Sequence, residues 1–214
     1  MGALSPGQRA QVHDLLRLTS PRVLHWEQAP QAWAQEALAA APWVVTRRAA
    51  ARAGRIAVGV RGAQRTQRAA AWVDAADVRE WLRPPELRAR VAGLDPARTA
   101  LGAWAALAQL EQAWSACGPS DWGPAGSVGF ELASGWACVG PASDLDIVVR
   151  CARAPARARA RGWLAALPRQ AAARIDVLLE WPAGGAALSE FAAGGCYLLR
   201  SPRGALLRPA PRSA

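Results

Sequence analysis

Two aspartates that lie one residue apart open an apolar run in the second half of the chain. Asp144 and Asp146 occur in the stretch GPASDLDIVVR. Because side chains alternate between the two faces of a strand, both carboxylates should share one face, with Leu145 and Ile147 in the core behind them. Mg²⁺ is commonly bound by one or two carboxylates together with substrate phosphates. The pair therefore predicts a site for Mg²⁺ and a triphosphate, with a solvated strand edge as the alternative interpretation.

Two further features could complete such a site. Gly126 and Ser127 open a predicted helix, and the exposed N–H groups of a helix N-terminus bind phosphate. Asp176 lies within RIDVLLE, where a carboxylate among apolar side chains is unfavourable unless it is paired or bound to a metal. If its strand pairs beside that of Asp146, three carboxylates converge. Asp176 could then accept a proton or share a second metal ion.

Arginines surround a glycine at the end of another predicted strand. Arg61, Arg65 and Arg68 flank Gly62 in VGVRGAQRTQR. Guanidinium groups match phosphate oxygens, so these residues are candidates for binding a triphosphate or the pyrophosphate of CoA. Arg65 and Arg68 would share a helix face if the stretch were helical. The alternative is a solvated basic face.

Two other sets of polar residues each allow two interpretations. The stretch CARAPARARARG contains Arg153, Arg157, Arg159 and Arg161, which reflect either composition bias or a docking surface for an acidic carrier protein. His13 and Asp14 could form a hydrogen-bonded pair at a functional site, although a position on a helix surface is the preferred interpretation.

The predicted elements alternate between helices and strands, which favours an α/β or α+β fold. The segment 117–126 is rich in Gly and Pro and is interpreted as a domain boundary. It separates a mixed α/β domain (1–118), expected to contact donor and partner, from a catalytic domain (119–214). Helices are predicted over 5–18, 31–41, 75–92, 96–116, 126–135, the end of 151–167, and 184–194; strands are predicted over 43–49, 55–62, 144–150 and 174–180, with a hairpin over 196–207.

Composition restricts the class of protein and of ligand. All 26 basic residues are arginine, and the formal net charge of +10 favours phosphorylated ligands or acidic proteins. The four cysteines form no C-x-x-C pattern, which predicts free and mostly buried thiols in a reducing cytoplasm. No apolar stretch predicts a signal peptide or a membrane span. No aromatic ribonucleoprotein motif is present, so nucleic acid is an unlikely partner.

The order of these motifs resembles known enzymes. Gly-Ser, then Asp-x-Asp, then an acid on a later strand resembles the nucleotidyltransferase superfamily that includes DNA polymerase beta. The 16 residues between Ser127 and Asp144 are more than that superfamily usually has. They are typical of the phosphoribosyl-dephospho-CoA transferase of malonate decarboxylase, its holo-acyl-carrier-protein synthase. The chain resembles that family over nearly its full length, through HDLLRL, PWVVTRRA, VGVRGAQRTQRAAAWV, GPAGSVGFELASG, SDLDIVVR and RIDVLLE.

This resemblance implies a polymerase-beta-like catalytic domain and a specific reaction. A serine of the acyl carrier subunit would attack the α-phosphorus of triphosphoribosyl-dephospho-CoA, and pyrophosphate would leave. Asp144 and Asp146 would be the catalytic, Mg²⁺-binding pair, and Asp176 would correspond to the third carboxylate by its place in the strand order. Two alternatives remain: a nucleotidyltransferase for a small molecule or RNA, and a non-catalytic nucleotide-binding regulatory module. The intact aspartate pair argues against the second.

Overall fold

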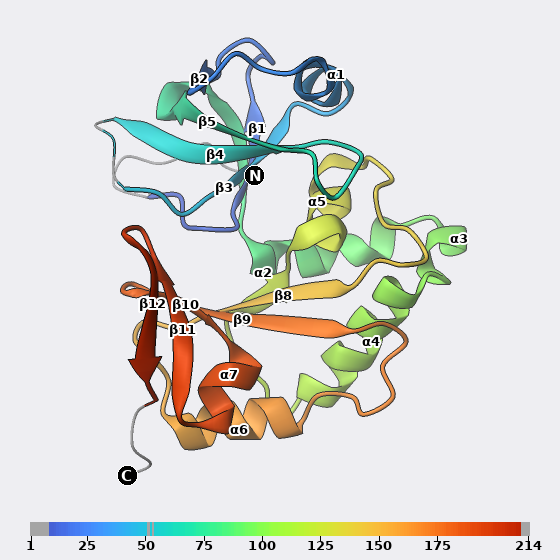
Figure 1. The fold of residues 1–214 in the computed structure, drawn as a ribbon. Coiled ribbons are helices and arrows are strands. Elements are labelled where there is room, and N and C mark those ends of the chain that lie inside the picture. The colour runs from blue at the N-terminus through green and yellow to red at the C-terminus, as the bar shows by residue number, and fades with distance from the viewer. Residues whose placement is uncertain (1–8, 51, 53, 211–214) are drawn as a thin grey trace.

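The computed structural model describes residues 9–50, 52 and 54–210, and it contains two six-stranded sheets, one above the other (Figure 1). The first sheet has the order β2-β5-β4-β3-β1-β6, and its neighbouring strands are all antiparallel. Its strands are β1 (Leu15–Leu18), β2 (His25–Trp26), β3 (Trp43–Thr46), β4 (Arg55–Arg61), β5 (Arg68–Asp74) and β6 (Val78–Leu82).

The second sheet has the order β12-β11-β10-β9-β8-β7. Only β8 and β9 pair in parallel, and the chain between them contains a helix, as a parallel connection normally requires. Helices and mixed or antiparallel sheets confirm the predicted α+β class. The strands are β7 (Trp122–Pro124), β8 (Leu145–Arg150), β9 (Ile175–Trp181), β10 (Gly184–Ala187), β11 (Cys196–Ser201) and β12 (Gly204–Pro209).

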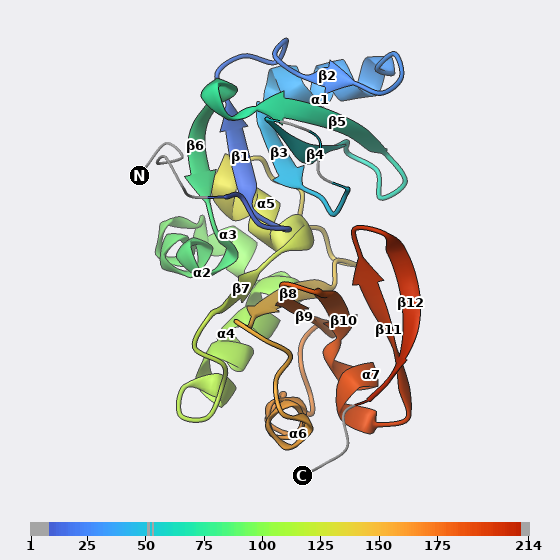
Figure 2. The same cartoon turned by 90° about the vertical axis from the view of Figure 1, so that its left-hand side faces the viewer.

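Helices cover both sheets. Helix α5 (Gly126–Ser134) lies between the sheets, whereas α4 (Gly102–Trp114), α6 (Arg157–Ala165) and α7 (Leu188–Ala193) lie on the side of the second sheet that faces away from the first (Figures 1 and 2). The first sheet is covered by α1 (Ala32–Ala40). The connection between the sheets consists of the short helices α2 (Pro84–Leu87), η2 (Arg88–Gly93) and α3 (Pro96–Thr99), and η1 (Ala75–Asp77) precedes β6.

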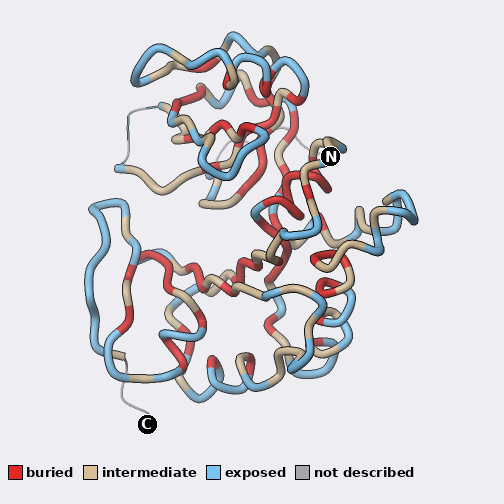
Figure 3. Tube along the Cα trace, turned by 45° about the vertical axis from the view of Figure 1, so that its right-hand side comes forward, coloured by how far each residue is buried: buried red, intermediate tan, exposed pale blue. Residues whose placement is uncertain are grey.

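Two apolar cores hold these layers together, and β1 contributes to both. Leu15 packs in the core of the second sheet and α5, while Leu16 and Leu18 pack in the core beneath α1. Buried segments are accordingly concentrated between the layers (Figure 3). A strand that is buried on both faces has no alternation of apolar and polar residues, so its pattern is ambiguous. For this reason the helix predicted over 5–18 is wrong at β1; residues 5–8 lie outside the described part.

Three other predicted elements need correction. The helix predicted over 75–92 is interrupted by β6, in which Val78, Glu80 and Leu82 are buried and alternate with less buried residues, and only short helices flank that strand. The predicted linker 117–126 contains β7, all of whose residues are buried in the second sheet. The first part of the helix predicted over 184–194 is β10, which pairs with β9.

The remaining predictions of local structure are confirmed. The strands near 43–49, 55–62, 144–150 and 174–180 correspond to β3, β4, β8 and β9, and the predicted hairpin is β11–β12. The helices predicted over 31–41, 96–116 and 126–135, and at the end of 151–167, are also present. The domain boundary at 118/119 stays a prediction, although α4, which precedes it, already packs in the core of the second sheet.

Two smaller expectations concern the cysteines and the membrane. All four cysteines are free, as predicted, but Cys117 and Cys196 are exposed and the other two are only half-buried. Across the ranges that the structure describes, no helix combines the length and apolar character that crossing a bilayer requires.

Candidate functional site

The parallel pairing of β8 and β9 brings the three predicted carboxylates together. Asp146 lies directly opposite Asp176 in the strand register, and Asp144 immediately precedes β8. Leu145 and Ile147 are buried in the core on the opposite face, as the alternation predicted. The predicted convergence of carboxylates is therefore confirmed, while the catalytic roles of these residues stay predictions.

An arginine that the sequence analysis did not single out bridges two of these acids. Arg174 Nη2 lies 2.7 Å from Asp144 Oδ2 and 2.7 Å from Asp176 Oδ2. The hydrogen bond from Arg174, reinforced by its charge, holds the pKa of Asp144 below its usual value. Asp144 is therefore ionised and partly neutralised. The position of Arg174, two residues before an acid in RIDVLLE, was the available signal.

Asp146 is in a different electrostatic environment. Burial raises the pKa of Asp146, and the negative charges of Asp176 and Asp144 raise it further. No ion pair joins Asp146 to any residue of the described ranges within 4.0 Å. The charges of Arg65 and Arg61 oppose this rise without forming an ion pair, so a bound cation would stabilise the ionised form of Asp146.

Gly126 allows helix α5 to approach this carboxylate. The Gly126 backbone has φ = +56°, and a Cβ atom built there would lie 1.9 Å from Asp146 Oδ2. The preceding N–H, of Ala125, donates to the carbonyl oxygen of Asp146 at 2.8 Å. Only glycine fits this position. The first turn of α5, with Gly126 and the buried Ser127, therefore begins directly beside the aspartates, where free N–H groups could bind phosphate.

The arginines of the β4–β5 hairpin belong to the same region. Arg65 Nη1 lies 3.7 Å from Asp144 Oδ2, and its side chain is otherwise exposed. Arg61 and Arg68 are directly opposite each other in the hairpin, so the stretch is not helical and Arg65 and Arg68 share no helix face. Like charges placed opposite each other repel, and Arg61 Nε is buried with no hydrogen-bond partner. An anion bound between these arginines would relieve both penalties.

A divalent cation fits the donors present here. Asp144 and Asp146 supply the one or two carboxylates that Mg²⁺ takes when a substrate phosphate completes its coordination. The described residues include no group of three or more His, Cys, Asp or Glu side chains arranged to hold a metal by themselves, and Arg174 lies between Asp144 and Asp176. The arrangement therefore fits a metal that binds together with the phosphates of its substrate.

The pair His13 and Asp14 does not lie on a helix surface, so the preferred prediction for it is wrong. Asp14 is fully buried, where it accepts hydrogen bonds from Arg150 Nη2 at 2.6 Å and Trp81 Nε1 at 2.8 Å. Burial raises the pKa of Asp14, although the charge of Arg150 opposes that rise. His13 has φ = +72°, and its Nε2 lies 3.3 Å from Glu180 Oε1. The two residues thus join the N-terminal segment to the second sheet.

The arginines of the segment 153–161 lie elsewhere. Arg157, Arg159 and Arg161 belong to α6, on the side of the second sheet that faces away from α5 and the first sheet (Figure 1). Arg157 donates to the carbonyl oxygens of Ala192 and Ala193, so it supports the end of α7. These arginines are therefore not close to the carboxylates.

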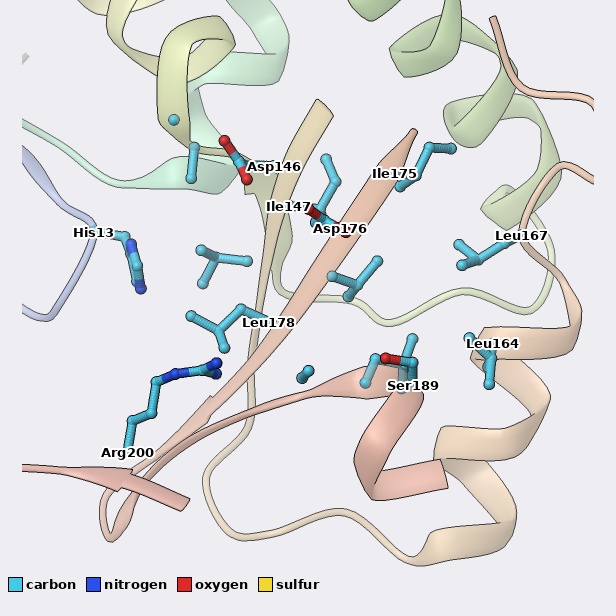
Figure 4. Close-up of a pocket in the computed structure, with 16 residues that line it drawn as sticks. His13, Asp146, Ile147, Leu164, Leu167, Ile175, Asp176, Leu178, Ser189 and Arg200 are labelled. Carbon is cyan, nitrogen blue, oxygen red and sulfur yellow. The ribbon is translucent and has the colours of Figure 1, made fainter. Parts of the chain in front are cut away.

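A cavity of about 490 Å³ adjoins the carboxylates (Figure 4). Asp146 and Asp176 lie at one part of its wall, and His13 and Arg200 lie at another, near Leu178. The complete lining is His13, Ala125, Gly126, Asp146, Ile147, Val148, Leu164, Leu167, Ile175, Asp176, Val177, Leu178, Ala187, Leu188, Ser189 and Arg200. The cavity thus offers acidic, basic and apolar surfaces to one ligand.

Comparison with known proteins assigns both parts of the chain. Residues 11–84 match the family model described as the N-terminal domain of phosphoribosyl-dephospho-CoA transferase MdcG, and residues 86–211 match that of its C-terminal domain. The two models meet between β6 and η2, close to the connection between the sheets.

Curated relatives agree with the family models. A phosphoribosyl-dephospho-CoA transferase of Pseudomonas putida (strain W619) is 44% identical over 201 residues, which are 92% of each chain. The protein of that name from Pseudomonas aeruginosa is 45% identical over 183 residues, 85% of this chain and 83% of the relative. One from Klebsiella pneumoniae (strain 342) is 36% identical over 201 residues, 93% and 94% of the two chains. No solved structure matches.

Proposed function

Since the chain belongs to the phosphoribosyl-dephospho-CoA transferase family, we propose that it modifies the acyl carrier protein of malonate decarboxylase. The donor is triphosphoribosyl-dephospho-CoA. A serine hydroxyl of the carrier attacks the α-phosphorus, a new P–O bond forms, and the bond to the leaving pyrophosphate breaks. The observation that carries this proposal is the register of Asp146 with Asp176, together with the start of α5 packed against Asp146.

Two groups of residues position the triphosphate. Helix α5 begins at Gly126 and Ser127 beside Asp146, and the free N–H groups of its first turn would bind phosphate there. The β4–β5 hairpin supplies Arg61, Arg65 and Arg68 from the first sheet, and guanidinium groups neutralise the charge that develops on phosphate oxygens. The triphosphate would therefore lie between the two sheets.

The carboxylates provide the second contribution. Asp144 and Asp146 would hold Mg²⁺, which when bound with the donor neutralises phosphate charge and orients the leaving group. Asp176 is placed to accept the proton of the serine hydroxyl, because it is the carboxylate opposite Asp146 on the neighbouring strand. Arg174 would have to release Asp144 or Asp176 for these roles, and its largely exposed side chain can move without loss of packing.

The partner fits the charge of the enzyme. Carrier proteins are generally acidic, and a formal net charge of +10 should raise their encounter rate with this chain. The arginines of α6 lie on the far side of the second sheet, so a carrier serine that reaches Asp146 would dock beside the β4–β5 hairpin and not on α6.

A mass measurement tests this proposal. The apo carrier subunit, triphosphoribosyl-dephospho-CoA and Mg²⁺ are incubated with the wild type, with Asp146→Asn, and with Asp77→Asn as a control of the same residue type at the end of η1. We expect the carrier serine to gain phosphoribosyl-dephospho-CoA and pyrophosphate to appear in equal amount, except with Asp146→Asn. Full activity without any divalent metal, or modification of RNA or a small molecule in place of the carrier, would refute it.

A further inference from the structure

Four side chains on one face of β8 and β9 form the floor of the cavity next to the carboxylates. Asp146 and Val148 of β8 lie opposite Asp176 and Leu178 of β9, and all four line the cavity. Two residues farther along β9, Glu180 lies on this same face, because strand side chains alternate. From Asp176 to Glu180 the strand advances about 13 Å. The floor therefore changes from acidic to apolar, and Glu180, which does not line the cavity, lies beyond its apolar part.

At that distant end, Arg200 and Glu180 belong to one cross-strand row, with one strand between them. Gly185 of β10 lies opposite Glu180 on one side and opposite Arg200 of β11 on the other. A Cβ atom on Gly185 would lie 2.4 Å from Glu180 Oε1 and 2.9 Å from Arg48 Nη2, so the pair of Glu180 and Arg48 fits here only because Gly185 lacks a side chain. Arg200 lines the cavity and has no carboxylate partner within the described ranges.

His13 reaches the same end from the N-terminal segment. Hydrogen bonds from His13 and Arg48, aided by their charges, hold the pKa of Glu180 below its usual value even though burial alone would raise it. An ionised carboxylate can only accept, so His13 Nε2 must carry the hydrogen of their 3.3 Å contact. Nδ1 is then the ring nitrogen left for a ligand, and it donates to a phosphate oxygen in the imidazolium form, in which both ring nitrogens carry hydrogens. The His13 backbone, at φ = +72°, is fixed by its N–H donating to the Thr46 carbonyl oxygen at 3.0 Å.

These two side chains together form a basic end of the cavity. Figure 4 shows the nitrogen-bearing ends of His13 and Arg200 directed toward Leu178, while Asp146 and Asp176 lie farther along the strands. We propose that His13 and Arg200 bind a second phosphate group of the ligand, separate from the group held at the carboxylates. This inference rests on the proposed function, because it assigns that group to the diphosphate of the dephospho-CoA part of the donor.

The spacing explains why one phosphate chain does not serve both ends. A triphosphate bound at Asp146 and the start of α5 stays within the reach of one metal ion. The basic end lies about two strand residues beyond Leu178, so the same triphosphate does not extend to it. The donor carries a triphosphate on its added ribose and a diphosphate in its dephospho-CoA part, and the apolar floor at Val148 and Leu178 lies between the two ends of the cavity. The basic end would thus orient the donor so that its α-phosphorus lies at the carboxylates.

Calorimetric titration with dephospho-CoA, which has the diphosphate but no triphosphate, tests this assignment. We expect Arg200→Gln to weaken binding about tenfold or more, since a charged hydrogen-bonding partner is lost. Arg208→Gln is the matched control, because Arg208 is exposed on the same hairpin and lies outside the cavity. Adenosine, which has no phosphate, should bind equally to all these proteins.

A second substitution and a second ligand show whether a loss of affinity comes from the basic end itself, and not from misfolding or from damage to the metal site. His13→Asn should also weaken dephospho-CoA binding, and Asn tolerates the left-handed backbone that His13 adopts. The affinity for tripolyphosphate with Mg²⁺ should stay within about twofold of the wild type in both variants, and should be lost in Asp146→Asn.

The results separate this inference from the proposed function. If Arg200→Gln binds dephospho-CoA as well as Arg208→Gln does, or if the wild type does not bind it, the second phosphate site is refuted. If Asp146→Asn retains turnover while Arg200→Gln loses dephospho-CoA affinity, the metal-dependent mechanism fails and the phosphate site stands.

Discussion

Asp146→Asn should make the metal-free protein more stable and at the same time inactive. Asp146 is the most buried of the three carboxylates, and it lies opposite Asp176 without an ion pair in the described part of the chain. The amide has nearly the same shape as the carboxylate, so packing against Gly126 is retained. What the substitution removes is one negative charge from a cluster of three.

The size of the stabilisation follows from the strand spacing. Neighbouring strands lie about 5 Å apart, and two like charges at that distance repel by about 3 kcal/mol at an effective dielectric constant of 20. Arg174 is bonded to Asp176 and cancels part of this repulsion. We therefore expect Asp146→Asn to raise the free energy of unfolding by about 1–3 kcal/mol at pH 7, and each kcal/mol corresponds to about 2–4 °C in Tm for a chain of this size.

The stabilisation should also depend on pH. The pKa of Asp146 is raised in the folded protein, so the folded state binds the proton more tightly than the unfolded state does. Below the pKa of about 3.9 that Asp has in the unfolded chain, Asp146 is protonated and makes its full contribution to the free energy of unfolding of the wild type. That contribution is lost as the pH rises through the higher pKa of Asp146 in the folded protein. The stability difference between Asp146→Asn and the wild type should therefore be small near pH 4 and should grow toward pH 7.

Urea denaturation across this pH range, with and without Mg²⁺ and tripolyphosphate, measures the effect. These ligands should stabilise the wild type by about 2.7 kcal/mol at one hundred times their Kd and should leave Asp146→Asn unchanged. Asp77→Asn is the control for loss of an aspartate outside the site. A variant that is less stable than the wild type at pH 7, or a difference that does not vary with pH, would show that Asp146 is not held in a repulsive cluster.

Three other substitutions test the surrounding structure. Gly126→Ala should abolish turnover and metal-dependent stabilisation, because the new Cβ would overlap the Asp146 carboxylate; retained turnover would contradict the packing. Arg68→Gln should weaken donor binding, measured by calorimetry, about tenfold or more. An unchanged affinity would mean that Arg68 belongs to a solvated basic face and does not bind the donor. Asp14→Ala leaves the buried guanidinium of Arg150 unpaired and should lower the free energy of unfolding by about 3–5 kcal/mol in urea denaturation; a loss below about 1 kcal/mol would mean that the pair is not structural.

Local sequence was sufficient for the elements that carry the aspartates. Asp144 and Asp146 precede and enter an apolar strand, and Asp176 enters another, so alternation alone predicted which faces they occupy. Gly126 and Ser127 were likewise recognised as the start of a helix. These predictions succeeded because strand alternation and helix starts depend on residues that are close together in the sequence.

Tertiary structure decided what surrounds the aspartates. Burial on both faces turned Leu15 and its neighbours into a strand where a helix was predicted, because long-range packing overrides a short apolar pattern. The same packing brought His13 to Glu180, 167 residues away, and Arg65 to Asp144. Sequence by itself determined the types of chemical group and their local faces. Which groups meet across the two sheets, and hence which carboxylate is neutralised by an arginine and which is left half-buried without an ion pair, depended on contacts between distant segments that no local pattern encodes.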